Sequence, residues 1–173
     1  DLGKLANLYD YLAETDPDPG QMEPINTKDC IDRSVSVCRE KFRALLGEIL
    51  IADIPALPSV LAHCYALDSI IHGLLCRATS ACLATEERPA KIVLSARAEK
   101  DRVVIAVSDN GGAVADAKMV FEPGHQGCAP GRGGPPLYIC KQLARRYGGD
   151  ITLKTNKAGG VVFEVWLPTD LTE

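Results

Sequence analysis

Hydrophobic positions in the first part of the chain recur at three- and four-residue steps, the spacing of one face of a helix. The first stripe predicts a helix that ends at the Pro- and Asp-rich segment 16–20. A second stripe predicts a helix over 27–46 with Thr27 as its N-cap. The first helix has no evident partner in the sequence. It is therefore either the end of a helical hairpin or dimerisation stem, or a helix that packs onto the domain.

Short apolar runs then alternate with turns in the middle of the chain. Segment 48–53 predicts a strand, and the long apolar stretch after two prolines predicts a helix over 60–83. Segments 91–97 and 102–108 predict two further strands. The charged turn 98–101 between them indicates a hairpin.

Glycine and proline dominate the stretch from Asn110 to Pro136. A loop of this length inside a compact domain is usually functional or disordered. It is followed by a predicted helix over 137–147 and by two predicted strands over 150–155 and 161–167. The resulting order fits one mixed sheet of about five strands with three helices on one face. The sequence therefore predicts an α/β two-layer sandwich.

Composition narrows the possible partners. A hydrophobic fraction of 46% and a charged fraction of 24% are ordinary for a globular protein, and the net charge of −4 gives no broad attraction to nucleic acid or to an acidic membrane. No run of about 18 apolar residues is present, so no membrane contact by this chain is expected. Because the chain opens with Asp1 in a helical pattern, we expect a fragment of a longer protein whose other parts could hold a membrane anchor or a sensor.

Seven scattered cysteines and the absence of any CxxC spacing do not favour a disulfide framework or a zinc site of the usual kind. Five of them lie in apolar or helical-looking stretches, where cysteine behaves as a small buried hydrophobe. We therefore expect reduced thiols and a cytoplasmic location.

Several segments, in this order along the chain, resemble the motifs of one family. Segment 107–112, Val-Ser-Asp-Asn-Gly-Gly, looks like the first glycine box of the superfamily that joins gyrase, heat-shock chaperones, histidine kinases and MutL. Segment 120–123 resembles the phenylalanine motif of histidine kinases, and 137–151 is similar to the helix after their second glycine box. Segment 159–168 resembles their final strand, and 54–60 matches the usual run into their asparagine box.

The resemblance implies a Bergerat-type ATP-binding fold over 20–173, with 1–19 as the end of a dimerisation stem and a linker. It implies ATP as the ligand, with Mg²⁺ bridging its phosphates. It also implies two-component signalling partners, namely the dimerisation helices of the same protein, and a response regulator or a partner kinase. The full-length protein is expected to be a homodimer.

Asp109 follows a predicted strand and precedes small residues, so its carboxylate lies at a strand end that a ligand can approach. The resemblance makes Asp109 the residue that accepts a hydrogen bond from the adenine amine, with Gly111 and Ala113 beside it. The alternative is an ordinary Asx turn, because Asp-Asn-Gly is also a common turn sequence.

The glycine-rich loop would let backbone amides approach phosphates, and a helix N-terminus follows at Leu137. The resemblance makes this loop the mobile ATP lid, with Gly131, Gly133 and Gly134 as its binding residues. A disordered loop is the alternative. No GxxxxGK[ST] motif occurs, which excludes a P-loop nucleotidase.

The sequence departs from the family where magnesium chemistry is expected. Alignment with the asparagine box puts Gly73 and Arg77 at its two asparagine positions, and the second asparagine is the magnesium ligand. A guanidinium offers only donors and a positive charge, so Arg77 cannot hold the metal. Arg77 could instead pair with phosphates in place of the cation, or bridge to Asp109 or Glu122 and close the pocket.

Further departures surround the same pocket. The polar or basic residue one turn after Arg77 is a serine, a glycine of the first box is an alanine, and the second glycine box has two prolines, which lack amide donors. A threonine of the last motif is a valine. These positions are Ser80, Ala113, Pro135, Pro136 and Val161. Together they predict a site relieved of catalysis, with no catalytic and no metal-binding residue.

Two main functions remain open. One is a pseudokinase-like regulatory module with weakened or lost phosphotransfer, and the other is an active domain that binds ATP and phosphorylates a histidine on a separate dimerisation domain. An ATPase or serine-kinase relative is a weaker third, because the run into the asparagine box is kinase-like. None of the three histidines precedes an acidic residue, so we expect His63, His72 and His125 to be structural or solvated.

Overall fold

The computed structural model describes residues 22–42, 49–51, 54–85, 89–123, 134–155, 157 and 159–170. The predicted first helix and the 1–19 stem lie outside these residues. No helix of the described part is both long enough and apolar enough to cross a bilayer.

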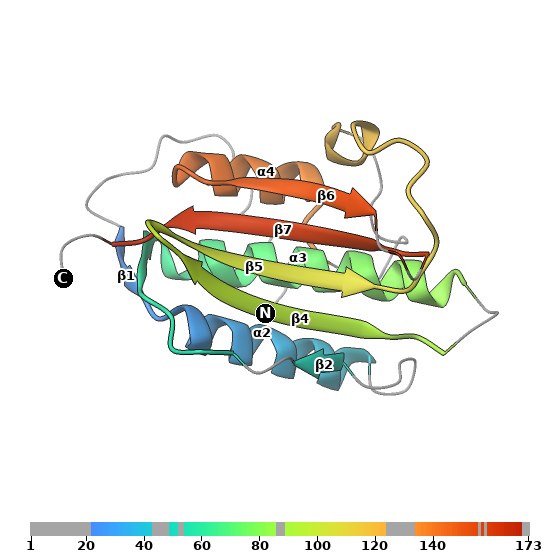
Figure 1. Ribbon diagram of the computed structural model, residues 1–173, viewed down its shortest axis with the longest axis horizontal. Coiled ribbons are helices and arrows are strands. Elements are labelled where there is room, and N and C mark those ends of the chain that lie inside the picture. The colour runs from blue at the N-terminus through green and yellow to red at the C-terminus, as the bar shows by residue number, and fades with distance from the viewer. Residues whose placement is uncertain are drawn as a thin grey trace.

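The described residues form the predicted sandwich around a five-stranded mixed sheet (Figure 1). The strand order is β2-β4-β5-β7-β6. The strands are β2 (Ile49–Ile51), β4 (Ile92–Glu99), β5 (Arg102–Asp109), β6 (Asp150–Thr155) and β7 (Val161–Pro168). Among the described strands of this sheet, β2 and β4 pair in parallel and the other neighbours are antiparallel. The fold predicted from the sequence is confirmed.

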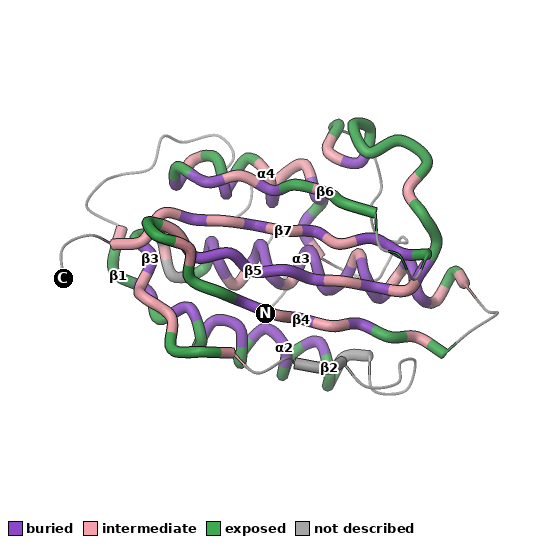
Figure 2. The backbone as a smooth tube through the Cα atoms, viewed as in Figure 1, coloured by how far each residue is buried: buried purple, intermediate pink, exposed green. Residues whose placement is uncertain are grey.

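Three α-helices of the described residues cover one face of this sheet (Figure 1): α2 (Thr27–Phe42), α3 (Cys64–Leu83) and α4 (Leu137–Arg146). α3 lies in the middle and is buried along most of its length, with α2 and α4 packed against it (Figure 2). Every second residue of the strands faces these helices, because successive strand side chains point to opposite faces. On β7 this inward row is Val161, Phe163, Val165 and Leu167, each at most 4% exposed.

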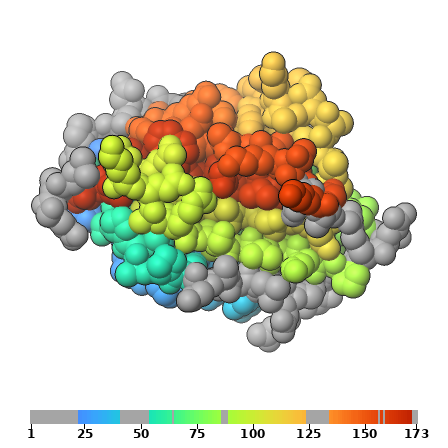
Figure 3. Space-filling view, in the orientation of Figure 1, coloured from blue at the N-terminus to red at the C-terminus, as the bar shows by residue number. Residues whose placement is uncertain are grey.

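The described helices leave the other face of the sheet uncovered, and Figure 3 shows strand residues at this surface. Charged side chains bridge neighbouring strands there. Glu164 on β7 accepts hydrogen bonds from Lys154 on β6 at 2.6 Å and from Arg97 on β4 at 3.3 Å. The outward row of β7 therefore combines the charged Glu164 with apolar residues such as Trp166, whereas its inward row is apolar throughout.

The start of the long central helix was predicted wrongly. Residues Val60–Ala62 form the strand β3, which pairs antiparallel with β1 (Glu23–Ile25), and α3 begins only at Cys64. His63 ends the strand and caps the helix, since its Nδ1 accepts the Tyr65 N–H at 3.3 Å. The predicted N-cap of α2 was also displaced by one residue, because the Asn26 side chain accepts the Asp29 N–H at 3.2 Å.

Candidate functional site

Asp109 ends the inward row of β5, so its carboxylate points into the layer between the sheet and α3. Its side chain is only 1% exposed, and its Oδ1 accepts the Gly111 N–H at 2.9 Å. This bond is the Asx turn that the sequence left open as an alternative. Burial raises the pKa of Asp109, and this effect is opposed in part by the Gly111 N–H and by the positive charge of Arg77.

Two glycines allow the chain to close tightly around Asp109. A Cβ atom on Gly111 would lie 2.6 Å from the Ala81 carbonyl carbon, so the segment after β5 rests directly on the end of α3. A Cβ atom on Gly160 would overlap the Asp109 carbonyl oxygen. Asp109 is therefore held between α3 and the turn that leads into β7.

Asn110 fixes the same strand end from the other side, a role that the sequence did not suggest. Its amide nitrogen donates to the Pro89 carbonyl at 2.8 Å, and its side-chain oxygen accepts the Lys91 N–H at 2.8 Å. The Cys82 thiol lies 3.4 Å from the same oxygen. Asn110 thus ties the segment before β4 to the end of β5 and to α3.

Arg77 extends from α3 toward the same region. Burial raises the pKa of Asp109, and the positive charge of Arg77 partly opposes this rise. The Arg77 guanidinium carbon lies 6.0 Å from the centre of the Phe163 ring. Two of the predicted site residues, Arg77 and Asp109, therefore lie close enough for their charges to interact.

The predicted phenylalanine motif packs against Phe163, the same residue that lies near Arg77. Phe121 belongs to the 3-10 helix η2 (Met119–Phe121), and its ring meets Phe163 edge to face at 6.2 Å. Lys141 on α4 places its Nζ 4.3 Å from the centre of the Phe121 ring and pairs with Asp150 at 3.0 Å. These contacts connect the segment before the glycine-rich loop to α4 and β6.

The face between α3 and α4 is closed where the resemblance implies phosphates. A Cβ atom on Gly73 would lie 2.5 Å from Cys140 Sγ and 3.0 Å from Pro135 Cγ. A Cβ atom on Gly134 would lie 2.8 Å from the Cys76 Sγ. Glycine at both positions is what lets the two helices approach, and no larger side chain fits at Gly73 without displacing Pro135 or Cys140.

The residues present do not fit a magnesium ion. Neither Gly73 nor Arg77 offers an oxygen ligand, and Mg²⁺ requires several in near-octahedral geometry. One turn further along α3, the Ser80 Oγ is buried and makes no hydrogen bond with any described residue. At the start of α4, Pro136 occupies the N-cap without a side-chain bond, and Pro135 and Pro136 contribute no amide donors.

The other predicted residues differ in their surroundings. Leu137 is 1% exposed and belongs to the core, whereas Ala113 is exposed. Gly131 and Gly133, like His125, lie outside the described residues. The lid assignment therefore remains a prediction.

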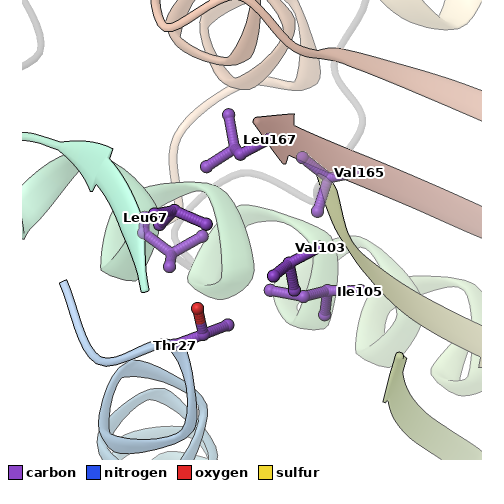
Figure 4. A pocket seen from close by; sticks show the side chains of 7 residues that line it. Thr27, Leu67, Val103, Ile105, Val165 and Leu167 are labelled. Atoms are coloured by element: carbon purple, nitrogen blue, oxygen red, sulfur yellow. The ribbon is translucent and has the colours of Figure 1, made fainter. Parts of the chain in front are cut away.

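A small apolar gap lies near the opposite end of β5 (Figure 4). Its lining comes from the core, and Thr27 supplies its one polar side chain. The lining residues are Thr27, Val60, Leu67, Val103, Ile105, Val165 and Leu167. The gap leaves no room for a water molecule, so it is an imperfection of packing rather than a binding site.

Comparison with known proteins agrees with this geometry. Residues 67–171 match the family described as "Histidine kinase-, DNA gyrase B-, and HSP90-like ATPase". The chain belongs to this family. It is an ATPase domain of the histidine kinase type.

Two relatives by sequence are sensor proteins. The chain is 37% identical over 81 residues to the alginate biosynthesis sensor protein KinB of Pseudomonas aeruginosa, which is 45% of this chain and 14% of KinB. It is 35% identical over 104 residues to the sensor histidine kinase DpiB of Escherichia coli, which is 58% of this chain and 19% of DpiB. The matched part of the chain thus spans less than a fifth of either relative.

Solved structures share the fold of this histidine kinase-type domain at low identity. The catalytic domain of the histidine kinase ThkA matches with a TM-score of 0.69 and 20% identity, over 86% of this chain and 95% of that one. The mycobacterial sensor histidine kinase MprB matches with a TM-score of 0.68 and 19% identity, over 86% and 97%. Full-length ShkA in complex with AMPPNP matches with a TM-score of 0.74 and 21% identity, over 97% and 35%.

Proposed function

We propose that this histidine kinase-type domain is a pseudokinase-like regulatory module that has kept the adenine side of the nucleotide site and has lost magnesium-dependent phosphotransfer. The observation that supports this most directly is the contact of Gly73 with Pro135 and Cys140. A magnesium-binding helix needs polar side chains along this face, and here a proline ring and a thiol occupy the space. Magnesium binding would therefore be lost because α3 and α4 pack differently, and not only because one ligand residue has been replaced.

Arg77 supplies the positive charge that the site retains. A guanidinium can donate two hydrogen bonds to phosphate oxygens, so it can hold a nucleotide without a metal. It cannot bridge two phosphates in octahedral geometry or neutralise the charge that develops during transfer as a divalent ion does. We therefore propose ATP as the ligand, with Asp109 on the adenine side and Arg77 on the phosphate side.

The proposed module would act through contacts. Its partners would be the dimerisation helices of its own full-length homodimer, and a response regulator or a partner kinase, all in the cytoplasm. The competing proposal is an active domain, in which ATP is bound and its γ-phosphoryl group passes to a histidine on a separate dimerisation domain. The preserved phenylalanine motif and its packing on Phe163 favour this second candidate.

Calorimetric titration with ATP separates the two proposals. The regulatory module should bind ATP equally well in magnesium and in EDTA, and Arg77→Ala should weaken binding at least tenfold. The matched control is Arg97→Ala, an arginine that pairs with Glu99 and Glu164 on the uncovered face of the sheet. Micromolar binding that requires magnesium and survives Arg77→Ala would contradict the proposal.

Adenosine tests the adenine side independently of the phosphates. We expect Asp109→Asn to weaken both adenosine and ATP, because the amide replaces one acceptor oxygen by a donor. Arg77→Ala should weaken only ATP. Equal adenosine binding by the wild type and by Asp109→Asn would show that Asp109 serves the Asx turn alone.

A further inference from the structure

A second group of chemically reactive side chains lies between α2 and α3. Cys38 on α2 places its Sγ 3.4 Å from Nδ1 of His72 on α3. Cys76, one turn after His72, places its Sγ 3.6 Å from Nε2 of the same ring. Two thiols and one imidazole from two helices thus form a compact cluster, with the three nearest ligand atoms within 4.8 Å of one another.

The spacing of this cluster suits a tetrahedral metal. Zinc binds thiolate sulfur at about 2.3 Å and imidazole nitrogen at about 2.0 Å, so a sulfur and a nitrogen on one zinc ion stand about 3.5 Å apart. Each sulfur lies at about that separation from a different nitrogen of the ring, Cys38 at 3.4 Å from Nδ1 and Cys76 at 3.6 Å from Nε2. A ring binds one ion through one nitrogen, so zinc binding requires the second sulfur to move from at most 4.8 Å to about 3.5 Å from that nitrogen, with the two sulfurs about 3.8 Å apart.

Charge and burial favour a divalent ion over a monovalent one. Cys38 and Cys76 are fully buried, and a buried net charge is costly. Two thiolates, one neutral imidazole and one Zn²⁺ together have no net charge, whereas a monovalent ion would leave a buried negative charge. His72 is partly exposed, which gives the ion a path of entry and leaves a fourth position for water.

We propose that Cys38, His72 and Cys76 form a zinc-binding site that joins α2 to α3. The site is distinct from the proposed nucleotide position and uses none of its polar residues. It adjoins that position through Cys76, whose Sγ would stand 2.8 Å from a Cβ atom on Gly134, just ahead of α4. Zinc bound at the cluster would therefore fix the helix against which the start of α4 packs.

Zinc binding would displace protons from both thiols. A cysteine thiol with its ordinary pKa of about 8.5 is mostly protonated at about pH 7. Zinc ligation requires thiolates. Calorimetry in buffers of different ionisation enthalpy should therefore report the release of about two protons per zinc bound.

The test is zinc titration of the whole chain, freed of metal with EDTA and kept reduced with a phosphine. We expect one Zn²⁺ per chain with a Kd below about 1 µM, and Co²⁺ should give thiolate-to-cobalt charge-transfer absorption. Cys38→Ala, Cys76→Ala and His72→Gln should each weaken binding at least 30-fold. Cys30→Ala on α2 is the matched control, because Cys30 is equally buried and its thiol, with a pKa raised to about 12, lies 3.2 Å from Arg33 rather than near His72.

Two outcomes would overturn the proposal. One is wild-type binding weaker than about 100 µM, which would mean that the cluster is only a hydrogen-bonded group of thiols and imidazole. The other is binding that survives all three substitutions but is lost in a Cys64→Ala/Cys128→Ala double variant. If either cysteine variant fails to fold, as judged by circular dichroism, His72→Gln and the proton count still test the proposal. His72 is partly exposed, so its substitution is expected to disturb folding less than that of a buried cysteine.

Discussion

Gly73 on α3 and Cys140 on α4 are in such close contact that a Cβ atom on residue 73 would stand 2.5 Å from the Cys140 sulfur. The contact joins two helices that are more than sixty residues apart in the chain. It also fixes which side chains residue 73 accepts.

Gly73→Asn, which restores the residue type that the family resemblance implies, should therefore destabilise the domain rather than repair it. We expect a loss of about 1–3 kcal/mol in the free energy of unfolding, the usual cost of overpacking, and no gain in magnesium-dependent ATP binding. Urea unfolding measures the first effect and calorimetry the second. Gly112→Asn is the control, because its Cβ position has only Thr85 Oγ1 nearby, at 3.7 Å. A stable Gly73→Asn variant that binds ATP with magnesium would contradict the repacked interface.

Asp109→Asn should change how stability depends on pH. Burial raises the pKa of Asp109 in the folded state, so the folded protein binds a proton more tightly than the unfolded chain does. This stability is fully present below the unfolded pKa and is lost as pH rises through the folded pKa. The Asn variant should gain stability over the wild type at about pH 7 and lose this gain near about pH 4. Urea titrations at both pH values test this, and a variant that is less stable at the higher pH would show that Arg77 outweighs burial.

Lys141→Met should weaken the junction of α4 and β6. Lys141 donates to the Ile151 carbonyl at 2.6 Å and pairs with Asp150 at 3.0 Å, so we expect a loss of about 1–2 kcal/mol. Burial alone would raise the pKa of Asp150, but the bonds from Lys141, the Ile151 N–H and Arg145 outweigh it and lower the pKa overall.

The loss from Lys141→Met should also depend on pH. Because the Asp150 pKa is lowered in the folded state, its stabilising contribution is present above the unfolded pKa and disappears as pH falls through the folded value. The difference between wild type and variant should therefore shrink in acid. Thermal unfolding at several pH values measures it, with exposed Lys118→Met as the control. A difference that stays constant would assign the effect to the Phe121 ring contact instead.

Gly160→Ala should be more damaging than an ordinary glycine substitution in a turn. The added methyl group would overlap the Asp109 carbonyl oxygen, so the turn before β7 must move away from β5. We expect a loss of about 2 kcal/mol or more, together with weaker adenosine binding. Gly112→Ala, which meets no such backbone atom, should change neither quantity by more than a small amount. Wild-type stability in Gly160→Ala would show that the turn yields easily.

Most of the sandwich could be predicted because its strands and helices differ in period and are separated by turn residues. The β4–β5 hairpin is the clearest case, with a two-residue turn at Lys100 and Asp101 inside the predicted turn 98–101, where charged residues interrupt two apolar runs. The β3 strand could not be predicted, since Val60–Ala62 continues the apolar run of α3. It is a strand only because Glu23–Ile25 and Thr169, distant in sequence, pair with it.

The residues of the candidate site could be predicted from the sequence, but the close packing of α3 and α4 at Gly73 could not. Motif order indicated Asp109, Arg77 and Gly73, whereas the contacts of Gly73 with α4 depend on how two helices pack. The cysteine and histidine cluster was hidden for the same reason. His72 and Cys76 stand one helical turn apart in the sequence, but the third member, Cys38, reaches them only through the packing of α2 on α3.

From the distribution of pairing along the sheet we expect an order of assembly. β4 and β5 pair over their full length across a tight turn, so this hairpin closes a very short loop. The pairing of β5 with β7 closes the much longer loop between Asp109 and Val161, so we expect this step to be slower. Since Asp109 is enclosed by α3, β5 and the turn before β7, nucleotide affinity during refolding should report the last step and not the collapse of the hairpin.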